Sequence, residues 1–141
     1  MAKTICKILG VVFILVGVLG FVAPGMLGMH LSLAHNLVHL ISGALALYFG
    51  FAGSLSGARM FCIVFGVVYA LLGVAGMLLG HDGAHTVAAV PAHGTDSNLL
   101  AALPGSLELA SPDHLVHILL GIVFLVGGFL TRSDLGVDRR D

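Results

Sequence analysis

The sequence predicts an all-α integral membrane protein of four transmembrane helices, arranged as two parallel, tandem helix-pair repeats with both termini in the cytoplasm. Three observations predict this fold: an apolar composition, an internal repeat and the placement of the basic residues. Of the 141 residues, 58% are hydrophobic and 9% are charged, whereas about 25% are charged in soluble domains. A bilayer span needs roughly 20 mostly apolar residues, and four such stretches occur, at about 5–23, 33–53, 60–80 and 113–131. We therefore expect a single membrane domain over 1–141.

The first and third apolar stretches repeat one another. The segment CKILGVVFILVGVLG that begins at Cys6 recurs 56 residues later as CIVFGVVYALLGVAG, which begins at Cys62. The second stretch matches the fourth at an offset of 78, which pairs His39 with His117, and the change of offset places an insertion of 22 residues within 81–112. We expect repeat 1 at about 5–53 and repeat 2 at about 60–131. Because each repeat contains two spans, both enter the membrane in the same direction.

Each predicted helix carries two glycines seven residues apart. This spacing places a small residue on the same helix face every two turns. Small residues let helix backbones approach closely in a bilayer, so we expect these glycines to have a structural role in helix packing. The pairs are Gly10 and Gly17, Gly43 and Gly50, Gly66 and Gly73, and Gly121 and Gly128.

Every lysine and arginine lies on one side of the predicted spans. Lys3 and Lys7 precede the first span, Arg59 lies between the second and third, and the remaining arginines follow the fourth. The positive-inside rule places these segments in the cytoplasm, and we expect the protein in the bacterial cytoplasmic membrane. Cys6 and Cys62 fall at the same side, where thiols stay reduced, so we expect no structural disulfide.

The segments outside the spans show ordinary boundary signals. We expect Pro24 to end the first helix, and Ser111 to cap the fourth, with Pro112 at its first position and Asp113 in its first turn. The insertion 81–112 is rich in Ala, Gly and Pro, and its apolar stretch 99–103 is too short to span a bilayer. We expect this stretch to lie along the membrane surface.

Short polar motifs occur in the second, third and fourth predicted helices. They are Asn36-Leu37-Val38-His39 followed by Gly43; Gly66, Tyr69, Gly73 and Gly76; and Asp113, His117 and Gly121. With these motifs the sequence resembles the bacterial family called domain of unknown function 4383, whose members look like small four-span membrane proteins. The resemblance implies the four-span fold and brings no established activity. The histidine-rich segment around 81–96 departs from it.

His39 and His117 occupy equivalent positions near the extracytoplasmic ends of the second and fourth helices. Polar side chains within spans are costly, so each is a candidate for function. Two imidazoles at matched depth could bind a haem iron, a chlorophyll-type magnesium or a transition metal. His35 and His114, on the adjoining turns, are further candidate ligands.

A structural role for the same histidines competes with ligand binding. In it, His39 and His117 donate hydrogen bonds to Asn36, to Asp113 or to backbone carbonyls, and so join the two repeats at their outer end. Closely packed, glycine-rich helices leave little room for a macrocycle. We therefore expect no cofactor, and keep haem, another tetrapyrrole or a transition metal as the alternative.

The predicted outer loops carry a second group of potential metal ligands. Histidine and carboxylate side chains at this spacing suit zinc, nickel or copper, and the methionines suit copper. A solvated loop and a proton-sensitive patch are the competing interpretations. The candidate ligands are His81, Asp82, His85 and His93, with Met26, Met29 and His30 on the facing loop.

The sequence assigns no catalytic residue. It lacks a G-x-S-x-G motif, a phosphate loop, H-E-x-x-H and an acidic pair within a span, and it has no basic surface for nucleic acid. We expect a non-enzymatic membrane protein, an accessory or structural subunit of a larger complex or a homo-oligomer. Its partners would be the lipid bilayer and other membrane subunits or itself. The alternatives are a haem, pigment or metal binder that uses His39 and His117, and an extracytoplasmic pH or metal sensor.

Overall fold

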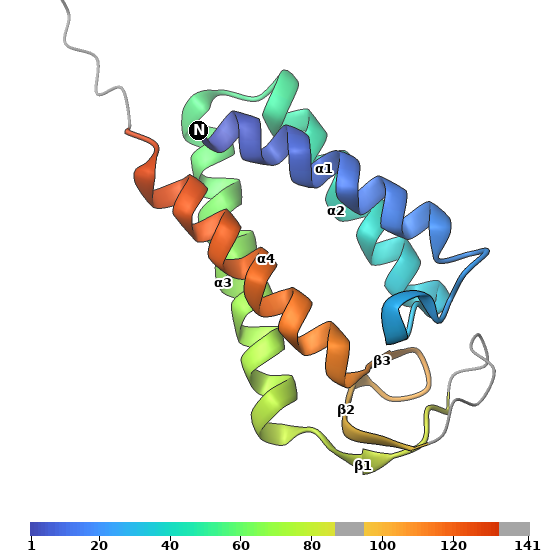
Figure 1. Ribbon diagram of the computed structural model, residues 1–141. Coiled ribbons are helices and arrows are strands. Elements are labelled where there is room, and N and C mark those ends of the chain that lie inside the picture. Colours follow the sequence, from blue (N-terminus) through green and yellow to red (C-terminus); the bar gives the residue numbers. More distant parts are fainter. Residues whose placement is uncertain (87–94, 133–141) are drawn as a thin grey trace, which may run out of the picture.

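The computed structural model contains four long α-helices that form two hairpins (Figure 1). It describes residues 1–86 and 95–132. The helices are α1 (Ala2–Leu19), α2 (Leu33–Phe51), α3 (Leu55–Leu79) and α4 (Ser111–Leu130). Each is long and apolar enough to cross a membrane, which agrees with the four predicted stretches. α1 packs along α2, and α3 packs along α4.

The two hairpins meet at one end and diverge toward the other (Figure 1). At the end where they meet, the backbone N–H of Ala2 donates to the hydroxyl of Thr131 over 2.7 Å. Further along, the ring of Phe13 stacks on that of Tyr69, with centroids 5.3 Å apart, and packs against Phe124. These aromatic rings belong to the buried core shared by both hairpins.

The predicted glycine stripes lie inside the hairpins. A Cβ atom on Gly10 would lie 2.8 Å from Cγ of Leu47 on α2, and one on Gly66 would lie 2.7 Å from Cγ of Leu125 on α4. Both distances are shorter than real Cβ contacts, so any residue but glycine would force the partner leucine or its helix to shift. The remaining stripe glycines also face the other helix of their own hairpin, namely Gly17, Gly43, Gly50, Gly73, Gly121 and Gly128.

α3 begins at Leu55, about five residues before the predicted stretch, and two helix boundary signals lie away from the observed helix ends. α1 ends at Leu19, before Pro24, because the next amides, of Phe21 and Val22, bond three residues back and tighten the chain into turns. A 3₁₀ turn at Met26–Gly28 follows.

α4 also differs, because it starts one residue earlier than predicted, with Ala110 at its N-cap. Ser111 is not the cap, since its N–H and hydroxyl both bind the carboxylate of Asp96. Asp113 does lie in the first turn, where its carboxylate accepts the N–H of Ala110 over 2.7 Å.

The insertion contains strands that the sequence did not predict. β1 (His81–Gly83), β2 (Asp96–Leu103) and β3 (Leu107–Leu109) form an antiparallel sheet in the order β1-β2-β3. The sheet lies at the end where the hairpins diverge (Figure 1). Leu99 and Leu109 are buried, so the apolar stretch 99–103 belongs to a strand that packs on the protein.

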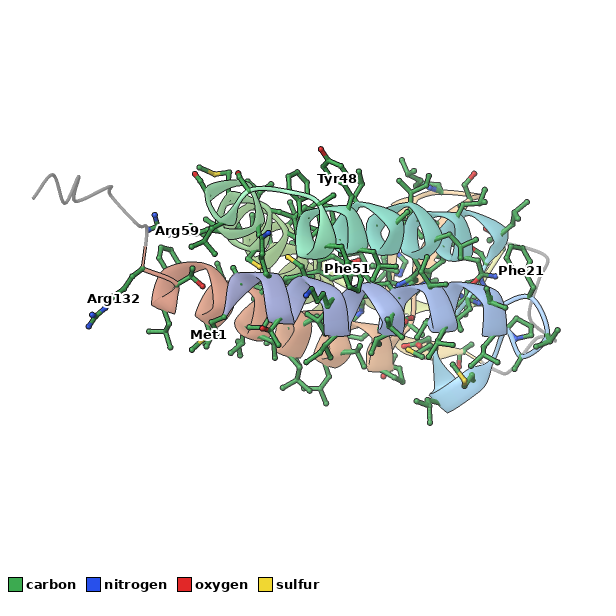
Figure 2. All side chains as sticks on the ribbon, turned by 90° about the horizontal axis from the view of Figure 1, so that it is seen from above. Met1, Phe21, Tyr48, Phe51, Arg59 and Arg132 are labelled. Atoms are coloured by element: carbon green, nitrogen blue, oxygen red, sulfur yellow. The ribbon has the colours of Figure 1, made fainter. Side chains whose placement is uncertain are left out.

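The outer faces of the helices are apolar. Ile41, Leu71 and Leu119 are all more than half exposed, an arrangement that lipid solvates and water does not. Figure 2 shows Arg59 and Arg132 at the same end as Met1, whereas Phe21 lies at the opposite end. Among the described residues, the basic side chains therefore gather at the end where the hairpins meet.

Candidate functional site

A pocket lies between the diverging hairpins, bordered by α2, α3, α4 and β3. Its volume is about 210 Å³. Most of its wall is apolar, and Leu107 and Leu109 contribute from the strand side. The polar side chains in the wall are His35, His39, Ser42, Tyr69 and His117.

The histidines of this pocket form one contiguous ring cluster with Tyr69. The His35 ring stacks on the His39 ring with centroids 4.7 Å apart, and lies 6.0 Å from the His117 ring. The Tyr69 ring lies 5.3 Å from that of His117, and Phe13 packs edge-on against His39 at the same distance. The fold therefore brings the two repeat-equivalent histidines to one site, as the sequence predicted.

The hydrogen bonds predicted for a structural role are not made by Nδ1 of these histidines. Nδ1 of His39 and of His117 is buried and has no hydrogen-bond partner among the described residues. Asn36 instead donates its side-chain N–H to the carbonyl of Leu31 over 3.3 Å. Each buried, unpaired polar atom costs about 1–3 kcal/mol, so the pocket contains two imidazoles with unused hydrogen-bonding capacity.

Of the two further candidate ligands, His35 lies at the pocket and His114 does not. His35 lines the pocket, but its Nδ1 donates to the carbonyl of His30 over 2.8 Å. His114 does not line the pocket, because its Nε2 bonds the carbonyl of Asn98 in β2 over 2.6 Å and its ring fills the space beside Gly76. Three of the four predicted histidines therefore converge, and the fourth fixes the sheet to α4.

Ser42 and Tyr69 are the pocket residues that sequence reasoning missed as site residues. Ser42 lies three residues after His39, and so on the same helix face. Tyr69 bonds to Ser42 through its side chain. The spacing of His35, His39 and Ser42 was the available signal, whereas nothing local to Tyr69 indicated that α3 faces α2 at this depth.

The fold does not bring the four predicted loop ligands together, but it places one of them beside two other potential ligands. His81 and Asp82 are exposed in β1, and His93 lies outside the described residues. His85 instead meets His30 and Glu108, and one potential ligand atom of each lies within 4.8 Å of the others. Burial, and then the neighbouring His85, lowers the pKa of His30 to about 4, so this imidazole is neutral near pH 7. Glu108 was not among the predicted ligands.

The fold and the pocket define a helical protein with four helices of membrane-spanning length. The small sheet β1-β2-β3, here called the strand cap, covers one end of the helices (Figure 1). The family model described as Domain of unknown function (DUF4383) matches residues 3–105, and the chain belongs to this family. The match includes His35 and His39 and ends before α4, which carries His117. Comparisons with curated proteins and with solved structures give no match.

Proposed function

We propose that this protein is a non-enzymatic membrane protein that binds the ring of a lipid-soluble molecule in the pocket between its hairpins. The observation that carries the proposal is the pair of buried imidazoles, His39 and His117, which line an otherwise largely apolar cavity. Nδ1 of each has no hydrogen-bond partner in the described part of the chain. A neutral imidazole donates at one nitrogen and accepts at the other. The pair therefore suits a ligand that bears carbonyl or hydroxyl groups.

The size of the cavity limits the ligand class. A buried apolar cavity of about 150 Å³ holds a benzene ring, so about 210 Å³ holds one substituted six-membered ring. A tetrapyrrole would need the hairpins to separate. A quinone or a phenol with an apolar tail fits the volume, the apolar wall and the hydrogen-bonding groups together.

Access to this pocket would come from the side of the bundle, between α2 and α3. Val38 and Val68 line the pocket and are nevertheless 44% and 47% exposed. In a membrane-spanning bundle this face contacts lipid, so a lipid-soluble ligand would enter through it and leave its tail in the bilayer.

Binding of a short-chain benzoquinone to the detergent-solubilised protein tests the proposal by isothermal titration. His39→Leu and His117→Leu keep a similar side-chain volume and remove the nitrogens. Each lost hydrogen bond is worth about 1 kcal/mol, so we expect affinity to fall about fivefold to tenfold. His81→Leu, at an exposed position outside the pocket, is the matched control and should bind like the wild type.

Two results would contradict this proposal. One is the absence of saturable binding by the wild type, with no ring compound in a solvent extract of the purified protein. The other is a visible haem or chlorin spectrum, which would instead favour the tetrapyrrole alternative. A metal that elemental analysis finds in the wild type but not in His39→Leu or His117→Leu would be one bound by these histidines.

A second candidate function is that of an accessory subunit or homo-oligomer. The stripe glycines do not favour it, because they are used inside each hairpin. What favours it is the exposed opening beside Val38 and Val68, against which a helix of another subunit or copy could pack. Blue-native electrophoresis after mild solubilisation tests it, and a protein that migrates only as a free monomer would exclude it.

We further propose that the hairpins are parallel repeats in the bacterial inner membrane, with both termini cytoplasmic. Equivalent contacts support the repeat: Gly10 meets Leu47, and their counterparts at the two repeat offsets of 56 and 78, Gly66 and Leu125, meet in the same way. The basic side chains at the end marked by Met1 support the orientation. The pocket and the sheet would then lie toward the extracytoplasmic side.

A further inference from the structure

We propose that His30, His85 and Glu108 form a binding site for a divalent transition metal ion of the zinc type at the sheet end of the molecule. One ligand atom of each lies within 4.8 Å of the other two. His30 lies between the 3₁₀ turn and α2, His85 follows β1, and Glu108 lies in β3. Three separate segments therefore converge at one point, and none of these residues lines the pocket of the proposed function.

Both imidazoles present a buried nitrogen that makes no hydrogen bond to the described residues. His30 is 2% exposed, and its Nε2 has no hydrogen-bond partner among the described residues; the same holds for Nδ1 of His85. The two rings stack with centroids 3.8 Å apart, and Nδ1 of His85 lies 3.6 Å from Oε2 of Glu108. Leaving such atoms unpaired is costly, and a cation bound by their lone pairs would remove this cost.

Neighbouring groups hold the side chain of Glu108 and the backbone of His30 in position. Thr86 donates its backbone N–H to Oε2 of Glu108 over 2.7 Å and its hydroxyl to Oε1. The backbone of His30 is fixed on both sides, since its N–H donates to Asp113 over 3.2 Å and its carbonyl accepts from His35. Outer partners of this kind orient the ligands in metal sites.

The donor set identifies the class of ion. Two imidazoles and one carboxylate suit Zn²⁺ or a neighbouring transition metal, whereas Ca²⁺ and Mg²⁺ prefer oxygen ligands alone. Three protein ligands would leave a tetrahedral ion one position for water or an external donor. Binding requires the stacked rings to tilt so that their lone pairs converge, and His85 lies in an irregular segment after β1 that permits this rotation.

Zinc titration of chelator-treated, detergent-solubilised protein tests the site against a chromophoric competitor. We expect one saturable site per chain, and an affinity loss of more than tenfold in His30→Gln, His85→Gln and Glu108→Gln. His81→Gln and Asp82→Asn are matched controls, because both residues are exposed in the adjoining strand, and should keep wild-type affinity. Thr86→Val leaves the ligands in place but removes a hydroxyl that orients Glu108, so we expect affinity to fall about 10- to 100-fold.

Two further measurements on the wild type do not depend on the folding of any variant. Zinc should raise the melting temperature, and X-ray absorption at the zinc edge should show nitrogen and oxygen ligands that include two imidazoles. The proposal is overturned if the wild type binds no zinc saturably, if His85→Gln binds normally, or if sulfur appears among the ligands. Loss of binding in the His81 or Asp82 control would place the ion in β1 and also overturn it.

Discussion

The Sγ atoms of Cys6 and Cys62 lie 3.5 Å apart in the contact between the two hairpins. The contact is reciprocal, since the thiol of Cys6 lies 3.8 Å from the carbonyl of Ala58 and the thiol of Cys62 lies 3.8 Å from that of Ala2. Both thiols are free and buried, and they join α1 to α3 at matched positions of the two hairpins.

This contact predicts that a membrane-permeable oxidant joins the two thiols within one chain. A disulfide needs an S–S distance of about 2.05 Å, which a small movement of two side chains already in contact provides. Intact mass after denaturation and alkylation measures the result: the oxidised chain should lose both thiol hydrogens and take up no alkylating reagent. Cys6→Ser should remain alkylated at its other thiol. Two alkylated thiols in the oxidised wild type would contradict the hairpin contact.

Replacement of Gly121 by alanine should destabilise the α3–α4 hairpin. The new Cβ would lie 2.6 Å from the backbone N and 2.9 Å from Cα of Ala70, and backbone atoms cannot turn away as a side chain can. We expect a loss of about 1–3 kcal/mol, larger than the gain of about 1 kcal/mol in helix propensity. The unfolding free energy in detergent measures this loss.

Gly127→Ala on the same helix is the matched control for Gly121→Ala. There the new Cβ would lie 2.5 Å from the terminal methyl of Ile5, which can rotate away, and its next contacts are at 3.4 Å. We expect stability close to that of the wild type. Equal losses in the two variants would show that the backbone contact of Gly121 is not the cause.

Asp96 should make the strand cap sensitive to acid. Burial raises the pKa of this carboxyl, but hydrogen bonds from the hydroxyl and N–H of Ser111 and from the N–H of Asn98 outweigh burial and hold it below its usual value. Its stabilising contribution is therefore full above the unfolded-state pKa of about 3.9 and is lost as the pH falls through the lower native value.

Asp96→Asn removes this titration and keeps the side-chain size. We expect the wild type to melt at a higher temperature than the variant near pH 6, and the difference to shrink below about pH 4. Circular dichroism measures the melting temperature of both proteins over this pH range. The difference between the two values reports Asp96, because the other titrating groups are the same in both proteins. A difference that stays constant with pH would argue against an ionised, hydrogen-bonded Asp96.

Cysteine labelling should report opposite membrane sides for the two ends of the bundle. Ser97 in β2 and Ser56 near the start of α3 are both exposed, whereas the native thiols are buried. In spheroplasts, a membrane-impermeant maleimide should label Ser97→Cys at once and Ser56→Cys only after permeabilisation. The reverse pattern would invert the proposed orientation, and labelling of both would contradict a membrane-spanning bundle.

The sequence by itself determined the four helices and the packing role of their glycines. Both depend on local periodicity and composition: apolar stretches of span length form helices, because lipid leaves backbone groups no other hydrogen-bond partner. The seven-residue spacing of Gly10 and Gly17 identified a helix face before any partner was known. The repeat also predicted that His39 and His117 would lie near each other, since equivalent residues share one depth.

Only the tertiary structure decided which polar groups meet at the sheet end of the molecule. The strands escaped prediction because Asp, Asn and Ala, which fill much of β2, are poor strand formers and pair there only through long-range contacts. Those strands bring Glu108 to His30 and His85, and move His114 out of the pocket and onto Asn98. A spacing rule cannot find such groupings, because the residues lie on segments whose relative placement is fixed only when the two hairpins pack around the aromatic core of Phe13 and Tyr69.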